Sequence, residues 1–428
     1  MPSWNTPRSR LGGALFTVVL IAGLTACGSS KSSAGAGGGS KEILVGVPAA
    51  LTGSAAAYGK PIATAAQMTA DAINNAGGIK ELGGAKLKLL VEDTKSDPAE
   101  TTKVLRDLAN KGVSAFEGPH PSADVIASKP LLESLKIPAL TASVDPTVTK
   151  DNQNGYVFRI APDTVTMVNS AVKQIGSMIK DGTYAQVHNV GILELTTAPG
   201  PAQLPVLKAG IESLGLQTTV IQYDPTQVKD FAPIVSKLQG AGVDLVVGNQ
   251  YPNDSVLFAQ ALGAQSWRPS AGFFFVGGPQ YLDSFRTAAG STAEGWLNAS
   301  FYTALDSDYF TPETRALAKA FAAKTGQTLE QSSGVSGASA IALIADALGK
   351  AKSTDPQKVA AALRSLSFSD PKGSEYPYYM NAGGLQYASD QNNAKIIVPI
   401  VQIQGKALTT VAPADIANGK LEVFGKTS

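Results

Sequence analysis

Residues 86–117 read KLKLLVEDTKSDPAETTKVLRDLANKGVSAFE and contain one strand–helix–strand unit. The stretch 86–92 is mostly apolar and short, which predicts a strand. Asp97 is a typical helix N-cap and Pro98 suits the first helical position, so a helix is expected to begin there. Its apolar residues fall on one face: Val104, Leu105 and Leu108. Residues 113–117 predict the next strand, and this order is the unit from which parallel sheets are built.

The same alternation continues on both sides of this unit. Further strands are expected at 43–47, 138–142, 189–193, 218–223, 243–248 and 273–276. Helices are expected at 61–76, 122–135, 164–179, 202–214, 253–262, 313–324, 337–351 and 355–366, with another capped by Asp230 and an extended segment at 396–403. Two α/β series of similar length predict two similar lobes with parallel sheets covered on both faces.

Open parallel sheets bind ligands at the carboxyl ends of their strands. Helices begin at this edge, and their N-termini offer unpaired N–H groups that favour carboxylates and other anions. Two such lobes facing each other would form a cleft that closes by a hinge motion.

The N-terminus has the pattern of an export signal. Two arginines precede the apolar stretch 11–24, which is too short for a comfortable membrane span and suits a secretory signal. It ends in LTAC at Cys27, which looks like a bacterial lipobox, and the Gly/Ser run that follows behaves as a flexible tether. An ordinary cleaved signal peptide with a chance cysteine is the alternative.

The composition excludes several classes of protein. Lys and Arg number 35 and Asp and Glu 34, so no basic excess indicates nucleic-acid binding. One cysteine excludes an internal disulfide and a Cys-rich zinc site, and two histidines leave little room for a His-based metal site or catalytic triad. We therefore expect no cofactor, no metal and no catalytic residue.

Several loop motifs carry a family resemblance. ILVGVPAALTGSAAAYGKP, VEDTKSDPAETTKVLRDLANKGVSAFEGP, NGYVFRIAP, KDFAPIVSKLQGAGVDLVVG and VPIVQIQGKAL occur in this order. The sequence resembles the periplasmic leucine/isoleucine/valine-binding protein family of ABC importers from Glu42 to Thr410. This resemblance implies the type I periplasmic binding protein fold, which has two Rossmann-like lobes, three hinge crossings and a ligand cleft between the lobes.

The resemblance also implies how the chain is divided. Crossings between lobes are expected near 158–162, 296–302 and 381–386. The expected parts are a lipoprotein signal peptide at 1–26, a lipidated cysteine and tether at 27–41, lobe 1 at 42–159 plus 302–384, and lobe 2 at 160–301 plus 385–428.

The resemblance places ligand contacts on two loops of lobe 1. Tyr58 matches an aromatic residue that packs against the ligand, although it can also merely cover the edge of the cleft. Ser122 matches a serine whose hydroxyl receives a ligand carboxylate, and its plain alternative is a helix N-cap. His120 lies in the same loop and could donate one hydrogen bond to the ligand.

A third loop of lobe 1 departs from the family pattern. Ala142, Ser143 and Val144 match positions that supply backbone and hydroxyl contacts. The family usually has Thr or Ser where Val144 stands, so one hydroxyl is missing unless Ser143 or Thr141 replaces it.

The loops of lobe 2 depart further. Thr197 and Ala198 stand where the family commonly has an acidic run and Tyr-Gly, whereas Tyr251 keeps a known contact position. Gln280, with Pro279, falls where an acidic residue usually receives the ligand ammonium. A buried ammonium without a carboxylate partner would cost several kcal/mol, of order ~5, so these losses argue against an ordinary α-amino acid.

These departures favour a small ligand with an acidic or amide end on lobe 1 and a neutral or aromatic remainder. An amino acid remains an alternative if Asp254 or Glu194 supplies the missing acid. We expect a monomeric, lipid-anchored solute receptor outside the cytoplasm that delivers its ligand to an ABC permease and its ATPase. A sensor of the same fold and a surface-tethered hydrolase are the rival functions.

Overall fold

The computed structural model describes residues 41–300, 310–330, 332–381, 383–405 and 407–423. The expected signal peptide and Cys27 therefore lie outside the described residues. Within the described residues, no helix is both long and apolar enough to cross a membrane.

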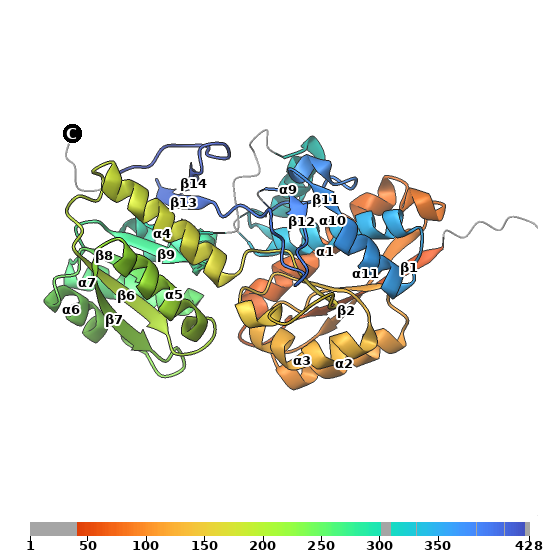
Figure 1. The fold of residues 1–428 in the computed structure, drawn as a ribbon, viewed down its shortest axis with the longest axis horizontal. Helices are drawn as coiled ribbons and strands as arrows, with labels where there is room; N and C mark the ends of the chain where they lie inside the picture. The colour runs from red at the N-terminus through yellow and green to blue at the C-terminus, as the bar shows by residue number, and fades with distance from the viewer. Residues whose placement is uncertain (1–40, 301–309, 331, 382, 406, 424–428) are drawn as a thin grey trace, which may run out of the picture. The chain divides into compact units, whose positions relative to one another are not determined.

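The first sheet has five parallel strands in the order β2-β1-β3-β4-β5 (Figure 1). The strands are β1 (Glu42–Ala49), β2 (Lys86–Asp93), β3 (Ala115–Glu117), β4 (Ala139–Thr141) and β5 (Val157–Arg159). Successive residues of a strand point to opposite faces of the sheet. Ala115 accordingly packs in one apolar cluster and Phe116 in another. This sheet is therefore buried on both faces, as the strand–helix alternation predicted.

Two groups of helices cover the first sheet. One group consists of α2 (Pro98–Asn110) and α3 (Ser122–Leu135), which contact each other. The other consists of α1 (Ala56–Asn75), α10 (Gly334–Ala351) and α11 (Pro356–Ser365), with α10 contacting both of the others. Helices α10 and α11 come from far along the chain, yet their residues share an apolar cluster with Ile43 and Val45 of β1.

The second sheet has the order β14-β13-β10-β9-β8-β6-β7. Its parallel strands are β6 (Asn189–Leu195), β7 (Gln217–Tyr223), β8 (Leu245–Gly248), β9 (Phe273–Val276) and β10 (Leu297–Ala299). β13 (Ile400–Gln404) and β14 (Ala407–Ala412) add an antiparallel edge to this parallel sheet. The extended segment expected at 396–403 is therefore a strand of the second sheet, although its antiparallel direction was not predicted.

The helices around the second sheet again fall into groups. They are α4 (Thr164–Lys180), α5 (Gly200–Ser213), α6 (Ala232–Gly240), α7 (Pro252–Gln265) and α8 (Asp283–Ala289). The later helix α9 (Pro312–Thr325) contacts α1 instead. α4 contacts α5, whereas α7 contacts both α6 and α8. Asp230, predicted to cap α6, lies two residues before the helix, and its carboxylate accepts a hydrogen bond from the Ala232 N–H at 2.8 Å.

The return of the chain toward the second sheet differs from the expectation. We expected a crossing at 381–386 and lobe 2 from 385 onward. β12 (Leu385–Gln386) instead pairs with β11 (Ser367–Phe368), and the Tyr387 ring lies 5.1 Å from the Phe158 ring of β5. These residues contact the first lobe because Tyr387 belongs to its apolar cluster. The division into lobes as a whole stays a prediction.

Candidate ligand-binding site

The carboxyl edge of the first sheet brings several predicted residues together. Strand β3 ends at Glu117, and the chain then passes through His120 to Ser122, where α3 begins. Strand β4 ends at Thr141 and leads into the loop that contains Ala142 and Ser143. Adjacent parallel strands place these two loops side by side at the carboxyl edge of the sheet, where open parallel sheets bind ligands.

Ser122 and Ser143 are the predicted residues that meet most directly. Their hydroxyl oxygens lie 2.7 Å apart, and either hydroxyl can be the donor. The N-cap of α3 is Pro121, without a side-chain capping bond, so the Ser122 hydroxyl does not cap the helix. The pair lies beside the first-turn N–H groups of α3, which have no partner within the helix. Two hydroxyls at a helix N-terminus suit an anionic or polar group of a ligand.

His120 is held from both ring nitrogens. The Ala142 N–H donates to Nδ1 at 3.0 Å, so Nδ1 carries no proton, and Nε2 therefore donates to Oε1 of Glu117 at 2.6 Å. This geometry assigns a neutral ring with the proton on Nε2. Both ring nitrogens and the Ala142 N–H are therefore hydrogen-bonded within lobe 1. We expected that His120 could donate one hydrogen bond to the ligand.

The loop after β4 uses its other polar groups internally as well. The Thr141 hydroxyl donates to the Pro119 carbonyl at 2.7 Å and accepts from the Ser143 N–H at 3.1 Å. The Val144 carbonyl accepts from the N–H of Thr164 at 2.8 Å and from its hydroxyl at 3.1 Å. Thr141 therefore does not replace the hydroxyl missing at Val144. The Ser143 hydroxyl faces Ser122.

On the second sheet, Tyr251 joins two of the predicted loops. Its hydroxyl donates to the Ala198 carbonyl at 2.7 Å, which links the loop after β8 to the loop after β6. Tyr251 remains 38% exposed, and Thr197 and Ala198 are exposed. These residues are accessible at the carboxyl edge of this sheet, where a ligand is expected.

Gln280 lies beneath the surface. Its side chain is fully buried, its Nε2 donates to the Ser255 hydroxyl at 3.2 Å, and its Oε1 accepts from Asn298 Nδ2 at 2.8 Å. The Ser255 hydroxyl in turn donates to Gln250 Oε1 at 3.0 Å. Gln280 is thus a neutral member of a buried amide network that supports the loops after β8 and β9.

Two carboxyl groups occupy the carboxyl edge of the second sheet. Glu194 is fully buried, and burial raises its pKa well above the usual value. Burial also raises the pKa of Asp254, whose Oδ2 accepts from the Tyr223 hydroxyl at 3.2 Å. One oxygen of Glu194, Oε2, has no hydrogen-bond partner. Both acids that the sequence offered as substitutes are therefore present in lobe 2, in surroundings that favour their neutral form.

Tyr58 is half-buried, and the Ser333 hydroxyl donates to its carbonyl at 2.6 Å. Burial raises the pKa of the Tyr58 phenol, and the nearby phenols of Tyr281 and Tyr251 raise it further. Sequence reasoning missed Tyr281, although it directly follows Gln280 in the predicted loop. The Tyr58 side chain also packs against the apolar cluster that contains Tyr281.

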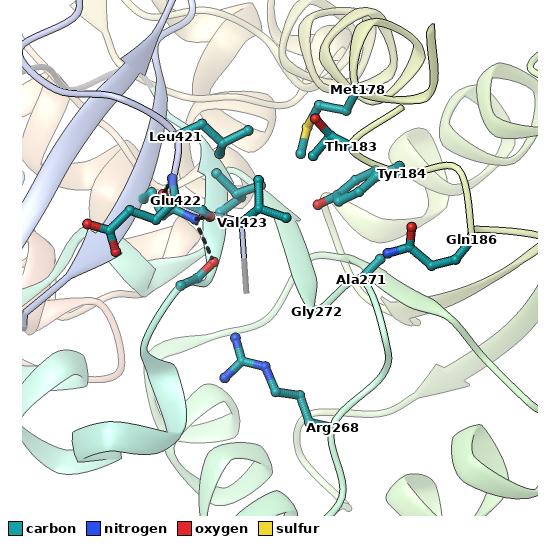
Figure 2. Close-up of a pocket in the computed structure, with 13 residues that line it drawn as sticks. Met178, Thr183, Tyr184, Gln186, Arg268, Ala271, Gly272, Leu421, Glu422 and Val423 are labelled. Atoms are coloured by element: carbon teal, nitrogen blue, oxygen red, sulfur yellow. Dashed lines mark hydrogen bonds between the residues drawn. The ribbon is translucent and has the colours of Figure 1, made fainter. Parts of the chain in front are cut away.

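A small cavity lies at the opposite edge of the second sheet (Figure 2). It measures about 20 Å³, and Tyr184, Arg268 and Glu422 are among its lining residues. Ala271 and Gly272 place it just before β9 begins, at the amino edge of the sheet. This volume suits about one water molecule, so it is not the ligand site.

Comparisons with known proteins agree with this arrangement. A family model described as periplasmic binding protein matches residues 42–384. The leucine-, isoleucine-, valine-, threonine-, and alanine-binding protein of Pseudomonas aeruginosa is 29% identical over 370 residues, covering 84% of this chain and 89% of that protein.

Solved structures share the fold at lower identity. The fatty acid ABC transporter substrate-binding protein of Thermomonospora curvata has a TM-score of 0.72 at 20% identity, covering 90% of this chain and 95% of that one. The branched-chain amino acid transporter substrate-binding protein of Streptococcus pneumoniae, in complex with isoleucine, has a TM-score of 0.70 at 20% identity, covering 87% and 100%.

The two sheets with their parallel strands have the type I periplasmic binding protein fold, which has two lobes. The chain belongs to the periplasmic binding protein family, and its resemblance to the leucine/isoleucine/valine-binding proteins is confirmed.

Proposed function

We propose that this protein is a lipid-anchored solute-binding protein that captures a small organic ligand outside the cytoplasm and delivers it to an ABC permease. The observation that carries the proposal is the Ser122–Ser143 hydroxyl pair at the start of α3. The relatives matched are named as binding proteins, which supports a receptor and not an enzyme. Closure would follow from population shift, because a ligand that contacts both lobes stabilises the closed form.

The proposed ligand carries a carboxylate or amide end for lobe 1 and a neutral or aromatic remainder for lobe 2. Gln280 supports this assignment because a buried, hydrogen-bonded amide offers no charge to an ammonium. The exposed Tyr251 beside Thr197 and Ala198 supports an uncharged or aromatic remainder.

An amino acid is the second candidate ligand, and a specific observation favours it. Glu194 has a buried oxygen without a partner, and an arriving ammonium would favour its ionised form. The Pseudomonas relative is named for five amino acids, and the Thermomonospora structure is named for fatty acids. The fold is therefore compatible with both classes of ligand.

A thermal-shift screen of residues 41–428 against amino acids, aromatic acids, short-chain acids and amides tests the proposal. A ligand at 100 times its Kd stabilises the fold by about 2.7 kcal/mol. The double variant Ser122→Ala/Ser143→Ala should lose this shift, because two hydroxyls at the site are removed.

Ser134→Ala is the matched control, since Ser134 is an exposed residue near the end of the same helix. It should keep the wild-type shift. An unchanged shift in the double variant would mean that the ligand binds elsewhere. The strongest shift with leucine, isoleucine or valine would select the amino acid candidate.

Two rival functions have their own tests. Loss of uptake of the identified ligand after gene deletion supports import, whereas unchanged uptake with a lost transcriptional response supports a sensor. Turnover of the bound compound by the purified protein would establish an enzyme and overturn the proposal.

A further inference from the structure

Arg159, the last residue of β5, carries a buried positive charge at the candidate site. The residue is 1% exposed, and no salt bridge to a carboxylate within 4.0 Å is recorded for it among the described residues. Its guanidinium is instead satisfied by neutral oxygen atoms. A buried cation is costly unless hydrogen bonds surround it, so the arrangement of these oxygens is specific.

Two of these oxygens belong to the loop that carries Ser143. Nη1 of Arg159 donates to the Ser143 carbonyl, and Nη2 donates to the Asp145 carbonyl at 2.7 Å. The guanidinium therefore fixes the backbone directly behind the Ser143 hydroxyl. It bonds to the backbone of the loop, whereas Ser122 contacts the Ser143 side chain.

One of the two remaining oxygens belongs to Asn392, more than two hundred residues later in the chain, and the other to the nearby Thr149. Nε donates to Oδ1 of Asn392 at 2.7 Å, and Nη2 donates to the Thr149 hydroxyl at 3.1 Å. The Thr149 hydroxyl also donates to the same Asn392 oxygen at 2.9 Å, which closes a small ring of hydrogen bonds.

The backbone reinforces this connection. The Arg159 N–H donates to the Gln391 carbonyl at 3.0 Å, and the Asn154 N–H donates to the Ser389 carbonyl at 3.0 Å. Residues 389–392 thus lie along the chain between 152 and 159. A few residues later the same segment enters β13 of the second sheet.

We propose that Arg159 is a positioning residue that holds the Ser143–Asp145 loop and the 389–392 segment together as one unit. A planar guanidinium with five donors can reach both partners at once, whereas a lysine ammonium cannot match this fork. Because the segment leads into the second sheet, displacement of the ligand loop is transmitted to the connection between the sheets. The inference goes beyond the proposed function and does not depend on the identity of the ligand.

Hydrogen–deuterium exchange of the ligand-free protein tests the inference. Arg159→Lys should speed exchange about tenfold in peptides covering both 142–149 and 388–394. Peptides from α7 should keep their wild-type rates, because that helix has no contact with Arg159. A purely global loss of stability would instead raise exchange in all three regions.

Arg364→Lys is the matched control. Nη2 of Arg364 donates to the carbonyls of Asn154 and Gly155 at 2.7 and 2.8 Å, and its guanidinium lies over the Phe158 ring, but it has no bond to the ligand loop. This variant should leave exchange of 142–149 unchanged.

Asn392→Ala provides a second variant in case Arg159→Lys does not fold. It removes the oxygen that accepts from both Arg159 and Thr149. Exchange in 142–149 should therefore become faster, although Asn392 lies 243 residues after Thr149 in the sequence. Wild-type exchange of 142–149 in the folded variants would overturn the inference. Faster exchange confined to either segment alone would overturn it as well.

Discussion

Asp346 is a buried carboxyl on α10, outside the candidate site loops. Its oxygens accept from the Ser374 hydroxyl at 2.8 Å and from the Tyr376 N–H at 3.1 Å. Burial raises its pKa to about 7 in spite of these two donors. The folded protein therefore retains a proton that the unfolded chain releases near pH ~3.9.

This shift makes a prediction about stability. Between pH ~4 and ~7 the folded state binds more protons than the unfolded state at this site, so the contribution of Asp346 to stability falls as pH rises. Asp346→Asn removes the titration. The unfolding free energy of the variant minus that of the wild type, measured by urea unfolding, should therefore rise by about 2–4 kcal/mol between pH ~4 and ~8.

Asp71→Asn serves as the control for this measurement. Asp71 is exposed on α1, so its variant should follow the wild-type pH profile. Parallel profiles for wild type and Asp346→Asn would contradict the prediction.

At the residue scale, local chemistry could be predicted from the sequence and distant partners could not. Asp97 caps α2 with Pro98 at the first helical position, as expected, because a cap depends on neighbours three residues away. The bond from the Ala142 N–H to His120 depends on two adjacent strands, so no sequence pattern near His120 indicates it. Gln280 lies in the turn after β9, but its burial depends on Ser255 and Asn298, which come from other parts of the chain.

At the scale of elements, α1 and α10 cross with almost no space between them. A Cβ added at Gly337 would lie 2.2 Å from the Ile62 carbonyl oxygen, and that oxygen belongs to the backbone and cannot turn away. The close approach explains why a glycine occupies the first turn of this buried helix in spite of its cost to helix stability.

We therefore predict that Gly337→Ala lowers the free energy of unfolding by about 1–3 kcal/mol through overpacking. Gly349→Ala, on the same helix, is the control, because its added Cβ would meet the carboxylate ends of two flexible side chains, Glu81 and Glu375, and no backbone atom among its three nearest neighbours. That variant should be neutral or gain up to about 1 kcal/mol. Equal unfolding free energies for the two variants would refute the explanation.

Most elements lie within a few residues of their expected positions because hydrophobic periodicity is a local signal. α3 is confirmed at Ser122–Leu135 and β9 at Phe273–Val276. The antiparallel pairing of β13 with β10 could not be predicted from the sequence pattern, since it joins residues about a hundred positions apart. The pairing of β12 with β11 was missed for the same reason and because each strand has two residues.

At the scale of the whole molecule, anchoring by Cys27 is a prediction. In a bacterial host the wild type should incorporate a palmitate analogue and sediment with membranes, whereas Cys27→Ser should remain unlabelled and soluble. The double variant Cys27→Ser/Ser33→Cys restores a thiol in the tether but not in the lipobox. It should also stay unlabelled, and labelling of either variant would contradict the assignment.

The distribution of partners along the chain has a consequence for biosynthesis. The first sheet is complete by Arg159, but two of the three helices in one covering group, α10 and α11, begin only at Gly334, and the bond from Arg159 to Asn392 comes later still. In the second sheet, β10 likewise has no partner on one side until β13 is synthesised, beginning at Ile400. Contacts of such long sequence separation form slowly and late. A nascent chain therefore exposes an apolar face of the first sheet until α10 and α11 arrive, and truncation before Ile400 should leave β10 without its partner β13 at the edge of the second sheet.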